Sequence, residues 1–127
     1  MSTSLSFIGH ISTPYVYIKD CPRNISPDGP ECKITIDKSF ESGLRGLSEG
    51  DHILILYWLA EAKRDYLEDG KKGTFALRTP HRPNPIGAAV VPIIALKGNV
   101  IIVRGLDCLT GTALLDIKPA IYKENNQ

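Results

Sequence analysis

One ten-residue segment, residues 78–87, combines a rigid backbone with several hydrogen-bonding side chains. It reads Arg-Thr-Pro-His-Arg-Pro-Asn-Pro-Ile-Gly, and each proline fixes φ and pushes the residue before it towards extended geometry. The segment therefore cannot form a helix or a central strand. Its side-chain donors are Arg78, His81, Arg82 and Asn84. A stiff polar loop places binding groups at low ordering cost, which makes it a candidate ligand site. The alternative is a rigid turn whose polar side chains only face solvent.

A second polar cluster lies near the end of the chain and includes Asp107, residues 110–112, Asp116 and Lys118. Asp116 and Lys118 are two residues apart, so on a strand they share one face while Ile117 points to the other. A carboxylate beside an ammonium group can bind a zwitterion such as an amino-acid moiety. The alternative is a surface ion pair that contributes little. Together with the loop, this cluster predicts one site built from the donor loop and the Asp–Lys strand end.

Positive charge is concentrated in residues 71–82, although the net charge of the chain is only +1. This stretch contains Lys71, Lys72, Arg78 and Arg82 and no carboxylate. Such a patch suits an anionic ligand or a nucleic-acid backbone. A solvated loop with a chance cluster of charges is the competing interpretation.

Several common site types have no support in the sequence. There is no G-x-G-x-x-G, P-loop or G-x-S-x-G motif, which argues against a Rossmann nucleotide site, a kinase-type phosphate site and a serine hydrolase. The three histidines are far apart, and the three cysteines, Cys21, Cys32 and Cys108, lack C-x-x-C spacing. We therefore expect no metal site and no disulfide framework. No secretory segment or membrane-spanning apolar run is present, so we expect a cytoplasmic protein without membrane contact.

The 127 residues suffice for one domain, residues 1–127, made mainly of short strands separated by turn residues. We predict strands at residues 5–11 with an edge continuation at 15–18, then at 32–37, 52–60, 73–77, 88–96, 100–103, 106–109 and 113–117. Two short helical turns are expected, at residues 42–47 and 61–66, and a hairpin is expected to join the strands 88–96 and 100–103. This pattern predicts a mainly β fold, a small closed or nearly closed β-barrel. The apolar runs 52–60 and 88–96 exceed what one core can bury, which favours a symmetric homodimer.

Residues 73–87 closely resemble the signature of the TsaA-like family, also called the TrmO type. Further segments resemble the same family, at residues 8–11, 13–15, 43–47 and 106–119. The likeness extends over residues 7–119, and the Arg-Pro-Asn-Pro-Ile-Gly run is its most specific part.

The resemblance implies a β-barrel methyltransferase that differs from the Rossmann type and acts as a homodimer, with S-adenosylmethionine near the dimer interface. The reaction it implies is methylation of N6 of threonylcarbamoyladenosine beside the anticodon of tRNA. Asp116 and Lys118 are the expected catalytic residues, and Lys71 and Lys72 the expected RNA contacts. The expected cofactor contacts are Arg78, His81, Arg82, Asn84, Ile86, Gly87, Leu106, Asp107 and Leu109.

The chain departs from the family pattern at residues 50–51, at residues 110–113 and at Ala120. The departures at residues 110–113 and at Ala120 lie within or next to the second polar cluster, and the proline-rich loop is intact. A second interpretation therefore stays open, a noncatalytic barrel of the same family that binds the cofactor, a nucleotide or RNA.

Overall fold

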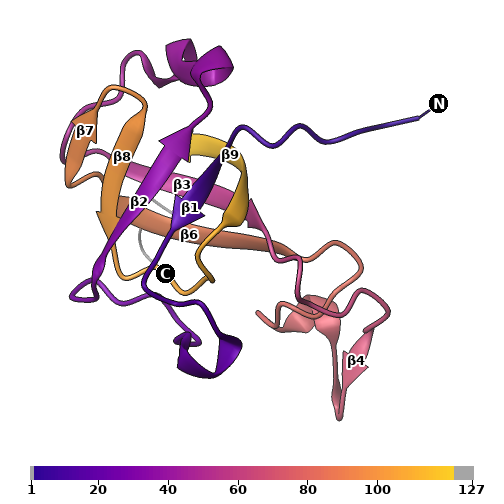
Figure 1. Ribbon diagram of the computed structural model, residues 1–127. Coiled ribbons are helices and arrows are strands. Elements are labelled where there is room, and N and C mark those ends of the chain that lie inside the picture. The colour runs from indigo at the N-terminus through magenta and orange to yellow at the C-terminus, as the bar shows by residue number, and fades with distance from the viewer. Residues whose placement is uncertain (1, 122–127) are drawn as a thin grey trace.

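The computed structural model describes residues 2–121 and consists mainly of one antiparallel sheet (Figure 1). Its seven strands lie in the order β6-β3-β9-β1-β2-β8-β7. Their bounds are β1 (Gly9–Ser12), β2 (Glu31–Ile36), β3 (His52–Trp58), β6 (Ile86–Pro92), β7 (Ala95–Lys97), β8 (Val100–Arg104) and β9 (Thr112–Pro119). β4 (Glu68–Asp69) and β5 (Lys72–Gly73) form a separate small hairpin, and three 3-10 helices are present, η1 (Ile18–Asp20), η2 (Lys38–Leu44) and η3 (Thr74–Ala76). No helix among the described residues is long and apolar enough to cross a membrane.

The core lies on the concave face of the sheet and follows the period-two alternation of the strands. In β3, Ile53, Ile55 and Tyr57 are buried, whereas the residues between them are half-buried on the opposite face. β-Branched residues dominate this core, and they pack well on a pleated surface. The fully buried aliphatic side chains are Ile11, Ile34, Ile36, Ile53, Ile55, Ile93, Ile101, Val103, Leu106 and Leu114.

The mainly β fold with short helical turns is confirmed, but a closed barrel is not. No ladder of hydrogen bonds joins the edge strands β6 and β7 in the described part of the chain, so the sheet is open. The two edges are nevertheless consecutive in sequence, since only Ile93 and Ile94 separate them. The sheet must therefore curl until its edges approach. Ile94 N–H donates to the carbonyl of Ile102 on β8 (2.8 Å), which ties the corner to the opposite edge.

The predicted strand 88–96 is wrong as one element, because it is broken at this corner. Pro92 has no N–H with which to continue the ladder, and Ile93 N–H donates to Asp51 O (2.9 Å). The chain then leaves β3 and pairs with β8 through the short strand β7. The predicted hairpin with residues 100–103 is therefore made by β7 alone.

Three other predicted strands are also corrected. The first strand begins at Gly9 and not at residue 5, because its pairing with β2 and with β9 begins at Gly9. Residues 15–18 form no strand and lead into η1. Instead of a strand at residues 73–77, η3 follows β5 directly, because Thr74 N–H donates to Leu67 O (2.8 Å) and Leu77 N–H closes a turn on Thr74 O (3.0 Å).

The segment 106–109 is also not a strand. It is held by the N-terminal part of the chain, where Thr13 Oγ1 donates to the carbonyl of Cys108 (2.9 Å). β9 therefore has β1 and β3 as its neighbours, and not residues 106–109. Residues 61–66 form no helix and make an irregular excursion between β3 and β4.

Candidate functional site

The proline-rich loop connects η3 to β6 and is anchored at both ends. Pro85 is fully buried, and its carbonyl accepts a hydrogen bond from Leu59 N–H (2.8 Å) just after β3. At the other end, the buried Thr74 donates through Oγ1 to Tyr66 O (3.3 Å). The loop is therefore fixed by tertiary contacts as well as by its prolines.

Arg82 braces the loop from inside. Its Nη1 donates to two backbone carbonyls, those of Leu77 (3.1 Å) and Thr79 (2.8 Å). The loop turns around this guanidinium. Its donors satisfy two backbone carbonyls that have no partner in a sheet. Arg82, predicted as a cofactor contact, therefore also has a structural role in the loop.

Arg64 holds the far end of the loop, and the sequence analysis did not single it out. Its Nε donates to Pro83 O (2.8 Å) and its Nη2 to Asn84 Oδ1 (3.4 Å). Its guanidinium carbon also lies 5.1 Å from the centre of the Trp58 ring, within the range of a cation–π contact. Asn84 is therefore oriented by an arginine twenty residues earlier in the sequence.

His81 faces the same excursion of the chain as Arg64. Its Nδ1 accepts a hydrogen bond from Lys63 N–H (3.0 Å), and its ring centre lies 5.7 Å from that of Tyr66. An accepting Nδ1 assigns the proton of the neutral ring to Nε2. Residues 61–66 thus pack against the loop and support its side chains.

Tyr57, Gly87 and Asp107 meet where the loop enters β6. Tyr57 Oη donates to Asp107 Oδ1 (2.8 Å), and a Cβ on Gly87 would lie 2.4 Å from Tyr57 Cε2. Burial raises the pKa of the Tyr57 phenol far above its usual range, the Asp107 charge adds to this, and the positive charge of Arg78 opposes it. These charges act on one ring because the two predicted motifs lie around it. Only glycine at position 87 allows the ring to pack this closely.

The segment that carries Asp107 is clamped against the N-terminal part of the chain. Thr13 N–H donates to Thr110 Oγ1 (3.1 Å), and Thr110 N–H donates to Tyr15 O (2.8 Å). Leu106 has no exposed surface and belongs to the core, whereas Leu109 and Asp107 are half-buried. Asp107 and Leu109 are therefore the predicted residues of this segment that remain accessible.

Asp116 and Lys118 share one face of β9, as predicted. Lys118 Nζ lies 3.2 Å from Asp116 Oδ2, and the side chains are 58% and 49% exposed, respectively. A bulge in the pairing of β9 with β3 places Asp116 opposite Leu56 and Lys118 opposite Leu54. This is the outer face of the sheet, whereas Tyr57 and its hydrogen bond to Asp107 lie on the inner face.

The single site predicted from both clusters is therefore realised only in part. Asp107 joins the loop through Tyr57. Within the described residues, no hydrogen bond or ion pair joins Asp116 or Lys118 to the loop. A ligand that contacts the loop and Asp116 together would have to extend past β3 or involve another chain.

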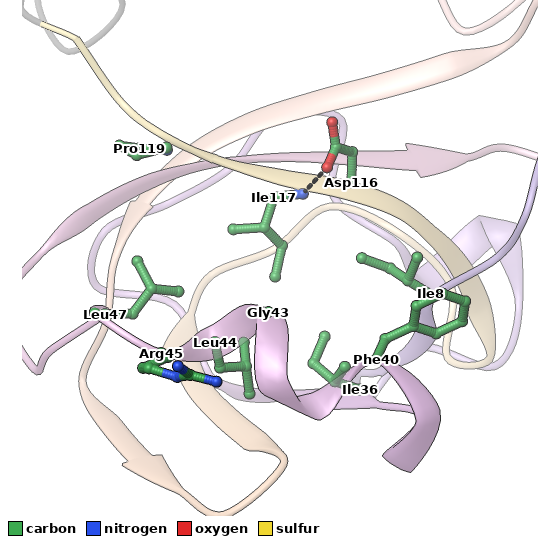
Figure 2. Close-up of a pocket in the computed structure, with 11 residues that line it drawn as sticks. Ile8, Ile36, Phe40, Gly43, Leu44, Arg45, Leu47, Asp116, Ile117 and Pro119 are labelled. Atoms are coloured by element: carbon green, nitrogen blue, oxygen red, sulfur yellow. Dashed lines mark hydrogen bonds between the residues drawn. The ribbon is translucent and has the colours of Figure 1, made fainter.

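A pocket of about 420 Å³ lies between η2 and β9 (Figure 2). Ile117 points from β9 towards Gly43, and the Asp116 carboxylate lies on the other side of the strand. The residues that line it are mostly apolar: Ile8, Ile36, Phe40, Gly43, Leu44, Arg45, Gly46, Leu47, Asp116, Ile117 and Pro119. The volume is within the range of small-molecule sites. The sequence analysis did not single out this pocket.

Lys71 and Lys72 lie on the β4–β5 hairpin, which extends away from the sheet together with η3 (Figure 1). Both residues are exposed. The loop and this hairpin are adjacent in sequence, so the positive charges of the predicted basic patch lie on one projecting part of the molecule. No group of three or more His, Cys, Asp and Glu residues within the described chain could hold a metal ion.

Comparison with known proteins gives a consistent set of matches. The family pattern of the tRNA-methyltransferase O N-terminal domain matches residues 10–125. The probable S-adenosyl-L-methionine-binding protein VirR of Rhizobium radiobacter is 47% identical over 122 residues, which cover 91% of this chain and 70% of that protein. A tRNA (adenine(37)-N6)-methyltransferase of Mus musculus is 36% identical over 90 residues, covering 64% of this chain and 21% of that protein.

The structure is similar to solved structures as well. The crystal structure of TrmO from Pseudomonas aeruginosa matches with a TM-score of 0.80 and 30% sequence identity. The match covers 95% of this chain and 57% of that one, so this chain spans little more than half of the solved one.

Proposed function

The chain belongs to the tRNA-methyltransferase O N-terminal domain family, and from this membership we propose that it is an S-adenosylmethionine-dependent tRNA methyltransferase. The observation that carries the proposal is the meeting of the proline-rich loop with residue 107 around Tyr57. These segments are twenty residues apart in the sequence, and both belong to the family signature. The names of the relatives, an S-adenosylmethionine-binding protein and a tRNA methyltransferase, support the same activity.

The residues around Tyr57 fit the chemistry of S-adenosylmethionine. The cofactor carries a carboxylate, an ammonium group and a sulfonium, and the site offers a guanidinium at Arg78 and a half-buried carboxylate at Asp107. Asp107 keeps lone pairs beyond the one that Tyr57 occupies, so it can accept further hydrogen bonds. Arg78, His81, Asn84, Ile86, Gly87, Asp107 and Leu109 would hold the cofactor, with Arg82 bracing the loop.

S-Adenosylmethionine, when bound, supplies an activated methyl group. The protein then mainly has to hold the acceptor nitrogen in line and remove its proton. We assign proton acceptance to the carboxylate of Asp116, with Lys118 3.2 Å away as its charge partner. The acceptor we propose is N6 of threonylcarbamoyladenosine beside the anticodon, and Lys71 and Lys72 would contact the tRNA backbone. We propose that the reaction takes place in the cytoplasm.

A homodimer is part of the proposal. The outer face of β3 and β6 presents half-buried Leu54, Leu56 and Trp58 next to the 41% exposed Ile86. A symmetric partner would bury this apolar face. In such a dimer, the loop of one copy could lie near Asp116 on the outer face of the other copy.

The competing function is a binding protein without turnover. It is favoured by one observation, the exposure of Asp116 and Lys118 in the single chain. Incubation with methyl-labelled S-adenosylmethionine and tRNA, with and without the threonylcarbamoyl group, separates the two. We expect label in the modified tRNA only. Tight cofactor binding in calorimetry without label in either tRNA would favour the binding protein instead.

A further inference from the structure

We propose that the N-terminal segment, residues 2–7 (called the arm here), inserts into the pocket between η2 and β9 of a second copy of this chain. The arm runs straight away from the sheet (Figure 1), and every residue in it is exposed. Leu5 is 60% and Phe7 49% exposed. They are two residues apart, so in an extended chain both side chains point to the same side.

The arm has the pattern of an edge strand that lacks a partner. Serines at positions 4 and 6 alternate with Leu5 and Phe7, which gives one apolar and one polar side. Within the described chain, residues 2–7 make no hydrogen bond, and the ladder begins only with Ile8 N–H, which donates to Leu114 O (2.9 Å). An extended segment with one apolar side and no hydrogen bond within the described chain favours a docking partner over solvent.

The pocket offers a matching surface. Its lining is mostly aliphatic and aromatic, and the Cβ position of Gly43 has no atom within 4 Å. Side chains around an empty space lose dispersion contacts that an inserted Leu or Phe would restore. The volume of about 420 Å³ has room for such side chains.

The position of the arm favours exchange between two copies. Ile8, which lines the pocket, is also the root of the arm, and its carbonyl accepts a hydrogen bond from Asp37 N–H (2.9 Å). The arm would have to reverse at once to enter its own pocket, yet residues 2–8 contain no glycine or proline for a tight turn. Around a two-fold axis near Ile8, three extended residues span about 10 Å, enough for each arm to reach the other pocket.

This inference goes beyond the proposed dimer face on β3 and β6, which does not need the arm. It places the arm of one copy against Ile117 of the other, on the side of β9 opposite the Asp116 carboxylate.

The test is a disulfide cross-link between two different proteins. Leu5→Cys protein is mixed with a size-tagged Gly43→Cys protein and oxidised, and we expect a linked heterodimer on a non-reducing gel. Phe75→Cys, at a side chain that is 80% exposed on η3, replaces Leu5→Cys in the matched control and should give no link. A second control mixes Gly43→Cys with the parent protein and detects any link that forms through the half-buried native Cys21.

Two results would overturn the proposal. The first is absence of the heterodimer link. The second is a link that forms only within one chain of the Leu5→Cys/Gly43→Cys double variant, which would mean that the arm folds back. Sedimentation provides an independent measurement. The Leu5→Ser/Phe7→Ser variant should weaken self-association at least tenfold, and Phe75→Ser should not. Unchanged self-association of the double variant would also contradict insertion of the arm. Methyl transfer in the absence of any link would leave the proposed function standing.

Discussion

Tyr57 Oη lies 2.8 Å from Asp107 Oδ1, and this hydrogen bond connects the C-terminal end of β3 to the segment before β9. It orients a half-buried carboxylate with a phenol whose own ring is fixed against Gly87. Hydrogen bonds to charged groups contribute about 1.5–3 kcal/mol. Tyr57 is thus the residue that joins Asp107 to the proline-rich loop.

Tyr57→Phe should keep the fold and weaken cofactor binding. Without the hydroxyl, Asp107 loses its orienting donor, and we expect affinity for S-adenosylmethionine to fall about tenfold, or about 1.4 kcal/mol. Isothermal calorimetry measures this directly. Tyr17→Phe, at a ring that is 63% exposed, is the control and should leave affinity unchanged. Equal affinities for Tyr57→Phe and the parent would remove Asp107 from the cofactor site.

Gly87→Ala should destabilise the fold, because its Cβ would overlap the Tyr57 ring. Overpacking of this kind costs about 1–3 kcal/mol. Gly43→Ala is a matched control, since its Cβ position is open. Urea denaturation of the two variants should therefore differ in midpoint, and similar midpoints would show that the ring moves aside freely.

Arg82→Ala should loosen the loop by leaving the carbonyls of Leu77 and Thr79 without their donor. We expect cofactor affinity to fall roughly ten- to a hundredfold, the equivalent of about 1.5–3 kcal/mol. Arg64→Ala should have a smaller effect in the same direction, because it orients only Pro83 and Asn84. Calorimetry at matched protein stability compares the loss of cofactor affinity in the two variants. A larger loss in Arg64→Ala than in Arg82→Ala would contradict this prediction.

Lys71→Ala and Lys72→Ala should weaken tRNA binding without changing cofactor affinity. Each lost phosphate contact should reduce the slope of log affinity against log salt by roughly 0.7–0.9. Filter binding at several salt concentrations measures the slope. Lys33→Ala, on β2 and outside the hairpin, is the control. A parallel slope in all three variants would place the tRNA elsewhere.

The free energy of unfolding should decrease as the pH rises above 9. Burial raises the pKa of the Cys108 thiol from its ordinary value of 9.0 to about 12, with the Asp107 charge adding to the effect. The unfolded thiol ionises first, so its stabilisation is fully present below pH 9 and is lost as the pH approaches 12. The slope for this group is up to about 1.4 kcal/mol per pH unit.

Urea titrations at pH 8 and pH 10 measure this loss. Cys108→Ala should flatten the dependence in part, since Tyr57 also ionises less readily in the folded chain than in the unfolded one. A dependence that is as steep in Cys108→Ala as in the parent would mean that the thiol does not contribute.

Local sequence features predicted what depends on local geometry. The prolines made residues 78–85 a rigid loop, and period-two alternation correctly placed Asp116 and Lys118 together on one face of a strand. Both results follow from torsional limits and from the repeat of a strand, which need no knowledge of distant partners. The apolar run with β-branched and aromatic residues predicts a strand at residues 52–60, and β3 confirms it over His52–Trp58.

Only the tertiary structure decided which groups face one another. The folded loop turned Arg82 towards the carbonyls of Leu77 and Thr79. Contacts between distant segments oriented Asn84 through Arg64 and joined Asp107 to Tyr57. They also delayed the start of the first strand to Gly9 and left the sheet open, because a strand forms only where a neighbour supplies hydrogen bonds. The choice of neighbour is a property of the whole chain, so neither the position of the arm nor the separation of Asp116 from the loop could be read from local spacing.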